Sequence, residues 1–74
     1  MQNEIKIGDA VETMQNNRAY GGGIYRINIG MVERFTPTQI IVRNEHGNLQ
    51  RFSRATFESI PQIDRLSPSF FRAL

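Results

Sequence analysis

The chain has 74 residues, of which 39% are hydrophobic and 22% are charged; nine basic and seven acidic residues give a formal net charge of +2, and cysteine is absent. This length allows one domain with a thin core, and the composition is too apolar for a disordered chain. Disulfides and thiolate metal sites are excluded, which fits a reducing cytoplasm.

The amino-terminal part predicts one strand followed by a long, mobile loop. Ile5, Ile7 and Val11 flank Gly8-Asp9, which indicates an incoming segment, a tight turn and a first strand over residues 10–14. Residues 15–23 are polar and end in three glycines, so they cannot bury a continuous face.

Residues 24–52 predict an antiparallel meander. Residues 24–29 alternate between apolar and polar, as in a strand or an ordered return arm of the loop, and a second strand starts near Ile29. The odd separation of Val32 and Phe35 places them on opposite faces unless a bulge intervenes. Polar breaks at 36–38 and 44–48 bound the next strand.

The hairpin after this strand has a predicted register. A three-residue loop over residues 45–47 would place Gly47 where a left-handed conformation is needed. Strand alternation then puts Ile40, Val42 and Phe52 in the core. The expected cross-strand pairs are Val42 with Gln50 and Ile40 with Phe52 on the core side, and Arg43 with Leu49 and Ile41 with Arg51 on the outer side.

The carboxy-terminal part has mixed signals. Residues 53–60 suggest a helical turn followed by a brief closing strand, which Pro61 ends. Ser67 as N-cap and Pro68 at the first helical position predict a short helix to residue 74. The expected fold is mainly all-β: one domain over 1–74, with a small five-stranded antiparallel barrel over about 5–60 and an extension, 61–74, containing a short helical turn.

Residues for catalysis or metal binding do not converge in the sequence. His46 is the only histidine and lies at the predicted hairpin tip, while the seven carboxylates are scattered. The glycines at 21–23 lack the lysine-serine ending of a phosphate-binding loop. We therefore expect a protein that is not an enzyme, with no catalytic residue, no metal and no cofactor.

Arginine dominates the basic residues, since only Lys6 is lysine. The planar guanidinium group suits phosphate and stacked contacts, and basic residues interleaved with aromatic ones are typical of nucleic-acid binding. Antiparallel pairing would gather the arginines of the strands on one basic face, unless nearby Glu33, Glu45 and Glu58 neutralise them. The candidate nucleic-acid contacts are Arg18, Tyr20, Tyr25, Arg26, Arg34, Arg43, Arg51 and Arg54.

The last residues are apolar for a terminus. Phe70, Phe71 and Leu74 either plug an open end of the barrel or form an exposed anchor for a protein partner. The longest apolar run, Ile40-Ile41-Val42, is far shorter than the roughly 20 residues of a membrane span. No signal-peptide pattern is present, so we expect a cytoplasmic protein without membrane contact.

Three segments resemble the opening of small Src-homology-3-like barrels of the KOW and Tudor type, and of short barrel proteins from bacteriophage genomes. The segments are Ile7-Gly8-Asp9-Ala10-Val11, Ile29-Gly30-Met31-Val32-Glu33-Arg34-Phe35 and Thr38-Gln39-Ile40-Ile41-Val42. The resemblance covers about residues 5–60 and implies binding rather than catalysis.

Two functions follow as expectations. The first is a phage-encoded protein that binds DNA or RNA phosphates through its arginines. The alternative is a protein-interaction module that docks on a host enzyme or transcription complex through the apolar tail or an exposed strand edge. Self-association that buries the tail is a third possibility.

Overall fold

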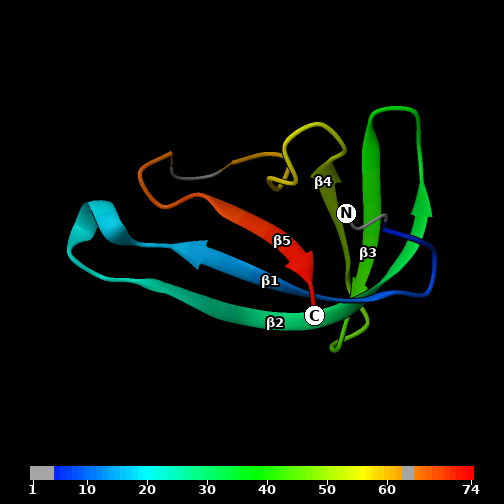
Figure 1. Ribbon diagram of the computed structural model, residues 1–74, viewed down its shortest axis with the longest axis horizontal. Helices are drawn as coiled ribbons and strands as arrows, with labels where there is room; N and C mark the ends of the chain where they lie inside the picture. Colours follow the sequence, from blue (N-terminus) through cyan, green and yellow to red (C-terminus); the bar gives the residue numbers. More distant parts are fainter. Residues whose placement is uncertain (1–4, 63–64) are drawn as a thin grey trace.

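Five antiparallel strands form one sheet that curls into a half-barrel (Figure 1). The computed structural model describes residues 5–62 and 65–74. The predicted all-β fold with five antiparallel strands is confirmed, and no helix in the described part of the chain is long and apolar enough to cross a bilayer. The strands are β1 (Ala10–Asn16), β2 (Ile24–Phe35), β3 (Gln39–Asn44), β4 (Leu49–Ser53) and β5 (Ser69–Ala73), in the spatial order β4-β3-β2-β1-β5.

Strand β2 is long enough to serve both halves of the sheet. It pairs with β1 from Ile24 to Met31 and with β3 from Gly30 to Phe35, and Figure 1 shows it running the length of the molecule. The spacing of Val32 and Phe35 left open whether they lie on opposite faces or a bulge intervenes, and the structure has a bulge between Val32 and Arg34. At Gly30 a Cβ atom would lie 2.6 Å from the carbonyl oxygen of Arg43, so β2 and β3 approach too closely there for a side chain.

The β1–β2 hairpin differs from the expected long loop. Strand β1 continues to Asn16, and the connection is only residues 17–23, with a 3-10 turn, η1 (Arg18–Tyr20). The Asn17 amide donates to the Gly23 carbonyl at 2.9 Å, and Gly21 takes a left-handed conformation with φ 83°. Polar residues 15 and 16 therefore belong to a strand because β5 and β2 supply backbone partners on both sides of β1.

The β3–β4 hairpin has the predicted loop and register. Gly47 has φ 84°, and its amide donates to the Asn44 carbonyl at 2.9 Å. Side-chain Oδ1 of Asn44 also accepts from the amides of His46 and Asn48. The pairs Ile40–Phe52, Ile41–Arg51, Val42–Gln50 and Arg43–Leu49 are all present.

Residues 57–60 form isolated bridges to the two edge strands instead of the predicted closing strand, and the fifth strand of the sheet comes from residues 69–73. The Phe57 amide donates to the Ser53 carbonyl at 2.8 Å and closes the turn after β4, where the sequence predicts a helical turn. Isolated bridges then pair Phe52 with Ser59 and Glu58 with Phe70. Hydrogen bonds from this segment thus reach both β4 and β5, which shields the exposed edges of the sheet.

The predicted short helix at the carboxyl terminus is wrong, because residues 69–73 form β5. This strand pairs with β1, with Phe71 opposite Thr13 and Arg72 opposite Glu12. Local capping signals at Ser67 and Pro68 favoured a helix, but an isolated helix of this length is unstable in water. Pairing with β1 satisfies the backbone and buries Phe71, so the tertiary contact decides the conformation.

The core lies on the concave side of the sheet and includes the tail. Ile40, Val42 and Phe52 are buried as predicted, and the rings of Phe52 and Phe71 are 4.8 Å apart. Phe71 also contacts the Phe57 ring at 4.8 Å, so it links the tail to the bridging segment 57–60. The core cluster consists of Val11, Val32, Ile40, Val42, Phe52 and Phe71.

Replacing Phe71 with alanine tests this role of the tail. We expect Phe71→Ala to reduce the free energy of unfolding by about 3–5 kcal/mol, because the variant loses buried apolar area and leaves a cavity. The matched change Leu74→Ala, at a side chain that is 61% exposed, should alter it by less than about 0.5 kcal/mol. Urea unfolding followed by circular dichroism measures both, and equal effects would contradict the assignment of Phe71 to the core.

Candidate functional site

Three arginines from consecutive strands share the face of the sheet opposite the core, which we call the outer face. Ile40 and Val42 of β3 belong to the core cluster, so strand alternation places Ile41 and Arg43 on the outer face, where Ile41 is only 4% exposed. Ile41 is paired with Arg34 of β2 on one side and with Arg51 of β4 on the other. We call Arg34, Arg43 and Arg51 the arginine cluster.

The cluster contains one ion pair. Arg43 donates from Nε and Nη2 to the two carboxylate oxygens of Glu33 at 2.9 and 3.0 Å, and from Nη1 to the Gly47 carbonyl at 3.0 Å. The hydrogen bond from Arg43 lowers the pKa of Glu33, and the hydrogen bond to Glu33 raises the pKa of Arg43. Arg34 and Arg51 make no salt bridge with any described residue.

A second group of charges lies further along the outer face. Glu12 of β1 accepts from Arg26 Nε at 2.9 Å and from Arg72 Nε at 2.8 Å, and its side chain is only 11% exposed. The hydrogen bonds from Arg72 and then Arg26 lower the pKa of Glu12. Both guanidinium groups are therefore held by one carboxylate. Sequence reasoning missed Arg72 because it placed residue 72 in a helix, and the run Ser69–Ala73 has no alternation that would indicate a strand.

Arg54 is not part of the outer face. Its Nη1 donates to the Thr36 carbonyl at 2.8 Å, and its guanidinium carbon lies 5.1 Å from the ring centre of Phe35. Phe35 packs against the core cluster, so Arg54 covers an end of the half-barrel. Both contacts lie away from the arginine cluster, so the structure does not bring Arg54 together with Arg34, Arg43 and Arg51.

The candidates around the glycine run lie on the β1–β2 hairpin, away from the arginine cluster. Arg18 and Tyr20 belong to η1 at the turn of the hairpin (Figure 1). The Tyr25 hydroxyl accepts from Asn17 Nδ2 at 2.9 Å and donates to Gln15 Oε1 at 3.4 Å, so this ring is tied to its own hairpin. The eight predicted nucleic-acid contacts therefore do not form one surface.

The predicted apolar tail does not form a single contact surface either. Phe71 is 1% exposed and sits in the core, whereas Leu74 is 61% exposed. Phe70, its neighbour in β5, is half-buried and bridges to Glu58. The interpretation of the tail as a plug of the barrel agrees with this arrangement.

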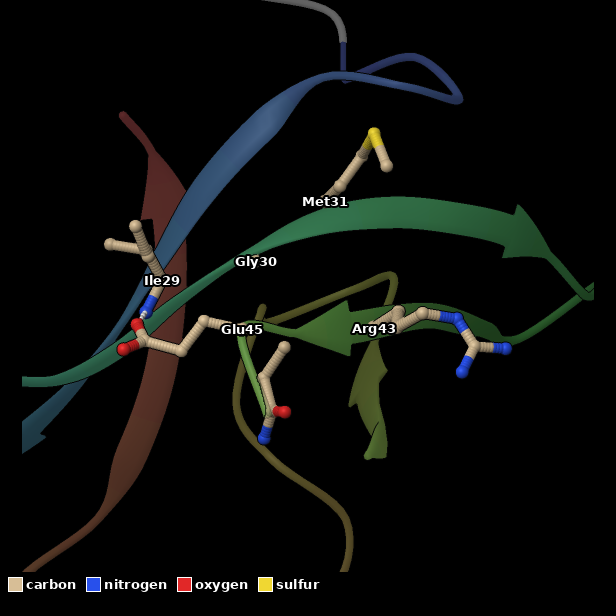
Figure 2. A pocket seen from close by; sticks show the side chains of 6 residues that line it. Ile29, Gly30, Met31, Arg43 and Glu45 are labelled. Atoms are coloured by element: carbon tan, nitrogen blue, oxygen red, sulfur yellow. Dashed lines mark hydrogen bonds between the residues drawn. The ribbon is translucent and has the colours of Figure 1, made fainter. Parts of the chain in front are cut away.

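A shallow hollow of about 290 Å³ lies beside the cluster where β3 leaves β2 (Figure 2). Ile29 and Met31 stand on either side of Gly30, and Met31 is 50% exposed. Glu45 closes one end: its Oε1 accepts from the Ile29 amide at 2.8 Å, and its own amide donates to the Ile29 carbonyl at 2.9 Å. Sequence patterns did not identify this hollow, whose lining residues are Ile29, Gly30, Met31, Arg43, Asn44 and Glu45.

Metal-ligating side chains do not gather among residues 5–62 and 65–74, since no three of His, Cys, Asp or Glu lie together there. Glu12 and Glu33 are held by arginine, whereas the Glu45 carboxylate accepts only from the Ile29 amide among the described residues. The outer face consequently offers guanidinium groups, apolar side chains and the Glu45 carboxylate as its binding groups.

Residues 2–63 match the protein family described as "Domain of unknown function (DUF7205)". The match includes β1 to β4 and all three arginines of the cluster, whereas β5 lies beyond it. Neither the curated proteins nor the solved structures contain a significant match to this chain.

The ion pairs of Arg26 and Arg72 with Glu12 predict that the stability of the protein depends on pH. Because the pKa of Glu12 is lowered from 4.5 on folding, its stabilising effect is full above that value and is lost as the pH falls through the folded pKa. The Glu12→Gln variant should therefore lose less unfolding free energy than the wild type between neutral pH and about pH 3. Glu33, whose pKa is also lowered, retains part of the dependence in the variant.

Chemical denaturation across this pH range provides the measurement. Glu33→Gln is the matched comparison, because it removes a carboxylate bound by one arginine instead of two. An unchanged pH dependence in Glu12→Gln would show that the two arginines do not stabilise the ionised carboxylate.

Proposed function

For this chain, which belongs to the family described as "Domain of unknown function (DUF7205)", we propose a non-enzymatic function: binding of nucleic-acid phosphates through the arginine cluster. The observation that supports it is the cross-strand register, which brings Arg34, Arg43 and Arg51 from β2, β3 and β4 onto one face. Strands in a sheet are about 4.8 Å apart, so Arg34 and Arg51 start about 10 Å apart on either side of β3. Side chains of this length can contact successive phosphates of one backbone.

The charge balance of the outer face favours an anionic partner. Three guanidinium groups and the Glu33 carboxylate leave the cluster with a formal charge of +2, equal to that of the whole chain. The Arg43–Glu33 pair is solvent-exposed, with side chains 45% and 35% exposed, and such pairs contribute little to stability. Arg43 can therefore exchange Glu33 for a phosphate, while Arg34 and Arg51 need to break no salt bridge within the described chain.

The proposal also includes a relation to known small barrels and action in the cytoplasm. The small five-stranded antiparallel sheet supports a relation to Src-homology-3-like modules of the KOW and Tudor type, including phage-encoded barrels. The absence of cysteine supports action in the cytoplasm. Docking on a host protein is the rival function. Its main candidate contact was the apolar tail, but Phe71 in the middle of that tail is buried in the core and is not accessible to a partner.

Reversing two charges of the cluster tests the proposal. The double variant Arg34→Glu/Arg51→Glu should bind a fluorescently labelled oligonucleotide at least about tenfold more weakly, and the slope of log affinity against log salt should fall by about 2. Fluorescence anisotropy at several salt concentrations measures both quantities, with DNA and RNA as separate probes. Circular dichroism checks that the variant is folded.

A matched control separates the cluster from net charge. Arg18→Glu/Arg65→Glu makes the same change of charge at two exposed arginines, one on the β1–β2 hairpin and one in the connection before β5. We expect this control to keep most of the affinity. Equal losses in both double variants, or no loss in Arg34→Glu/Arg51→Glu, would contradict phosphate binding by the cluster.

A further inference from the structure

We propose that the hollow next to the arginine cluster receives an unstacked base of single-stranded nucleic acid, with a preference for bases that carry an exocyclic amino group. This inference rests on the proposed function and specifies its ligand. The hollow and the cluster share Arg43, so a strand whose phosphates contact the arginines can extend one base over the adjacent hollow.

The shape of the hollow follows from strand alternation. Ile29 and Met31 project on the outer side of β2, while the missing Cβ of Gly30 would point toward Val42 Cγ1, 3.0 Å away in the core. The backbone at Gly30 thus forms a floor between two apolar walls (Figure 2). The space between the Ile29 side chain and the polarisable thioether of Met31 is suited to the face of a planar ring.

The two ends of the hollow carry opposite charges. Arg43 lies at one end, where Glu33 and the Gly47 carbonyl orient its guanidinium group. Glu45 lies at the other end and holds the Ile29 amide with Oε1, while its Oε2 accepts no hydrogen bond from any described residue. This free oxygen can accept from the amino group of cytosine, adenine or guanine, whereas thymine and uracil offer only an imide N–H that is flanked by two carbonyl oxygens, which repel the carboxylate.

A duplex cannot use the hollow in the same way. Its bases are stacked and paired, and a base must leave the stack before its face can contact protein side chains. Single strands present such bases without this cost. An acidic peptide would satisfy the arginines but would place further carboxylates near Glu45, so charge favours a nucleotide whose negative charge is on the phosphate and whose base is neutral.

Met31 and Leu49 provide a matched pair of variants. Both side chains are 50% exposed, and both are cross-strand partners of Arg43, but only Met31 lines the hollow. The probes are a labelled oligodeoxycytidine, an oligothymidine and an abasic oligonucleotide of equal length. The wild type should bind oligodeoxycytidine roughly threefold to tenfold more tightly than the abasic strand. Met31→Ala should remove most of this difference, and Leu49→Ala should retain it.

A second variant tests the role of the carboxylate. Glu45→Gln keeps an oxygen for the Ile29 amide but offers a neutral group to the base. We expect it to reduce the preference for oligodeoxycytidine over oligothymidine while leaving the affinity for the abasic strand within about twofold of the wild type.

The results distinguish this inference from the proposed function. Equal binding of the base-containing and abasic strands by the wild type, or equal effects of Met31→Ala and Leu49→Ala, would overturn base binding in the hollow. If Arg34→Glu/Arg51→Glu still weakened all the strands, phosphate binding by the cluster would stand. If the wild type bound none of the strands, both proposals would fail, whereas tighter binding of an acidic peptide than of any strand would replace nucleic acid by a peptide.

Discussion

The register of β3 against its two neighbours is the constraint on which the rest of the structure depends. One residue of slip would exchange the buried and exposed faces of the strand. The glycine turn at Gly47 sets the pairing with β4, and the bulge after Val32 sets the pairing with β2. Together they keep Ile40 and Val42 in the core and Arg43 outside. The apolar core and the charged outer face are thus two consequences of the same backbone pairing.

Carboxylates on the outer face organise its arginines into two groups with different availability. Glu12, which is largely buried, holds Arg26 and Arg72 and thereby connects β1, β2 and β5. Glu33 is more exposed and holds only Arg43. The first group is consistent with a structural role at the outer side of the sheet, and the second leaves a positively charged surface next to the hollow at Met31. Arginine content alone does not reveal this division, because it depends on which carboxylate each guanidinium group reaches in the folded sheet.

Several features of the fold could be predicted because they depend on neighbouring residues. The β3–β4 hairpin follows from a glycine in the left-handed region and from the register that a three-residue loop imposes on the two strands. For β2 the odd spacing of Val32 and Phe35 left two alternatives open, and only the structure decides for a bulge. The candidate site could be predicted only in part. Arg43 and Arg51 lie on strands whose faces were readable, whereas the bulge in β2 decides the face of Arg34. Arg54 and Tyr25 bond to groups that local patterns do not reveal.

By itself the sequence determined an all-β chain, the faces of β3 and β4 and the glycine turn between them, because these follow from side-chain alternation and local backbone preferences. Tertiary structure alone decided that residues 69–73 become β5 and that Phe71 completes the core, since β1 provides backbone partners that a short isolated segment lacks. It also decided which arginines Glu12 and Glu33 hold, because Glu12 and Arg72 are 60 positions apart in the chain and meet only through strand pairing.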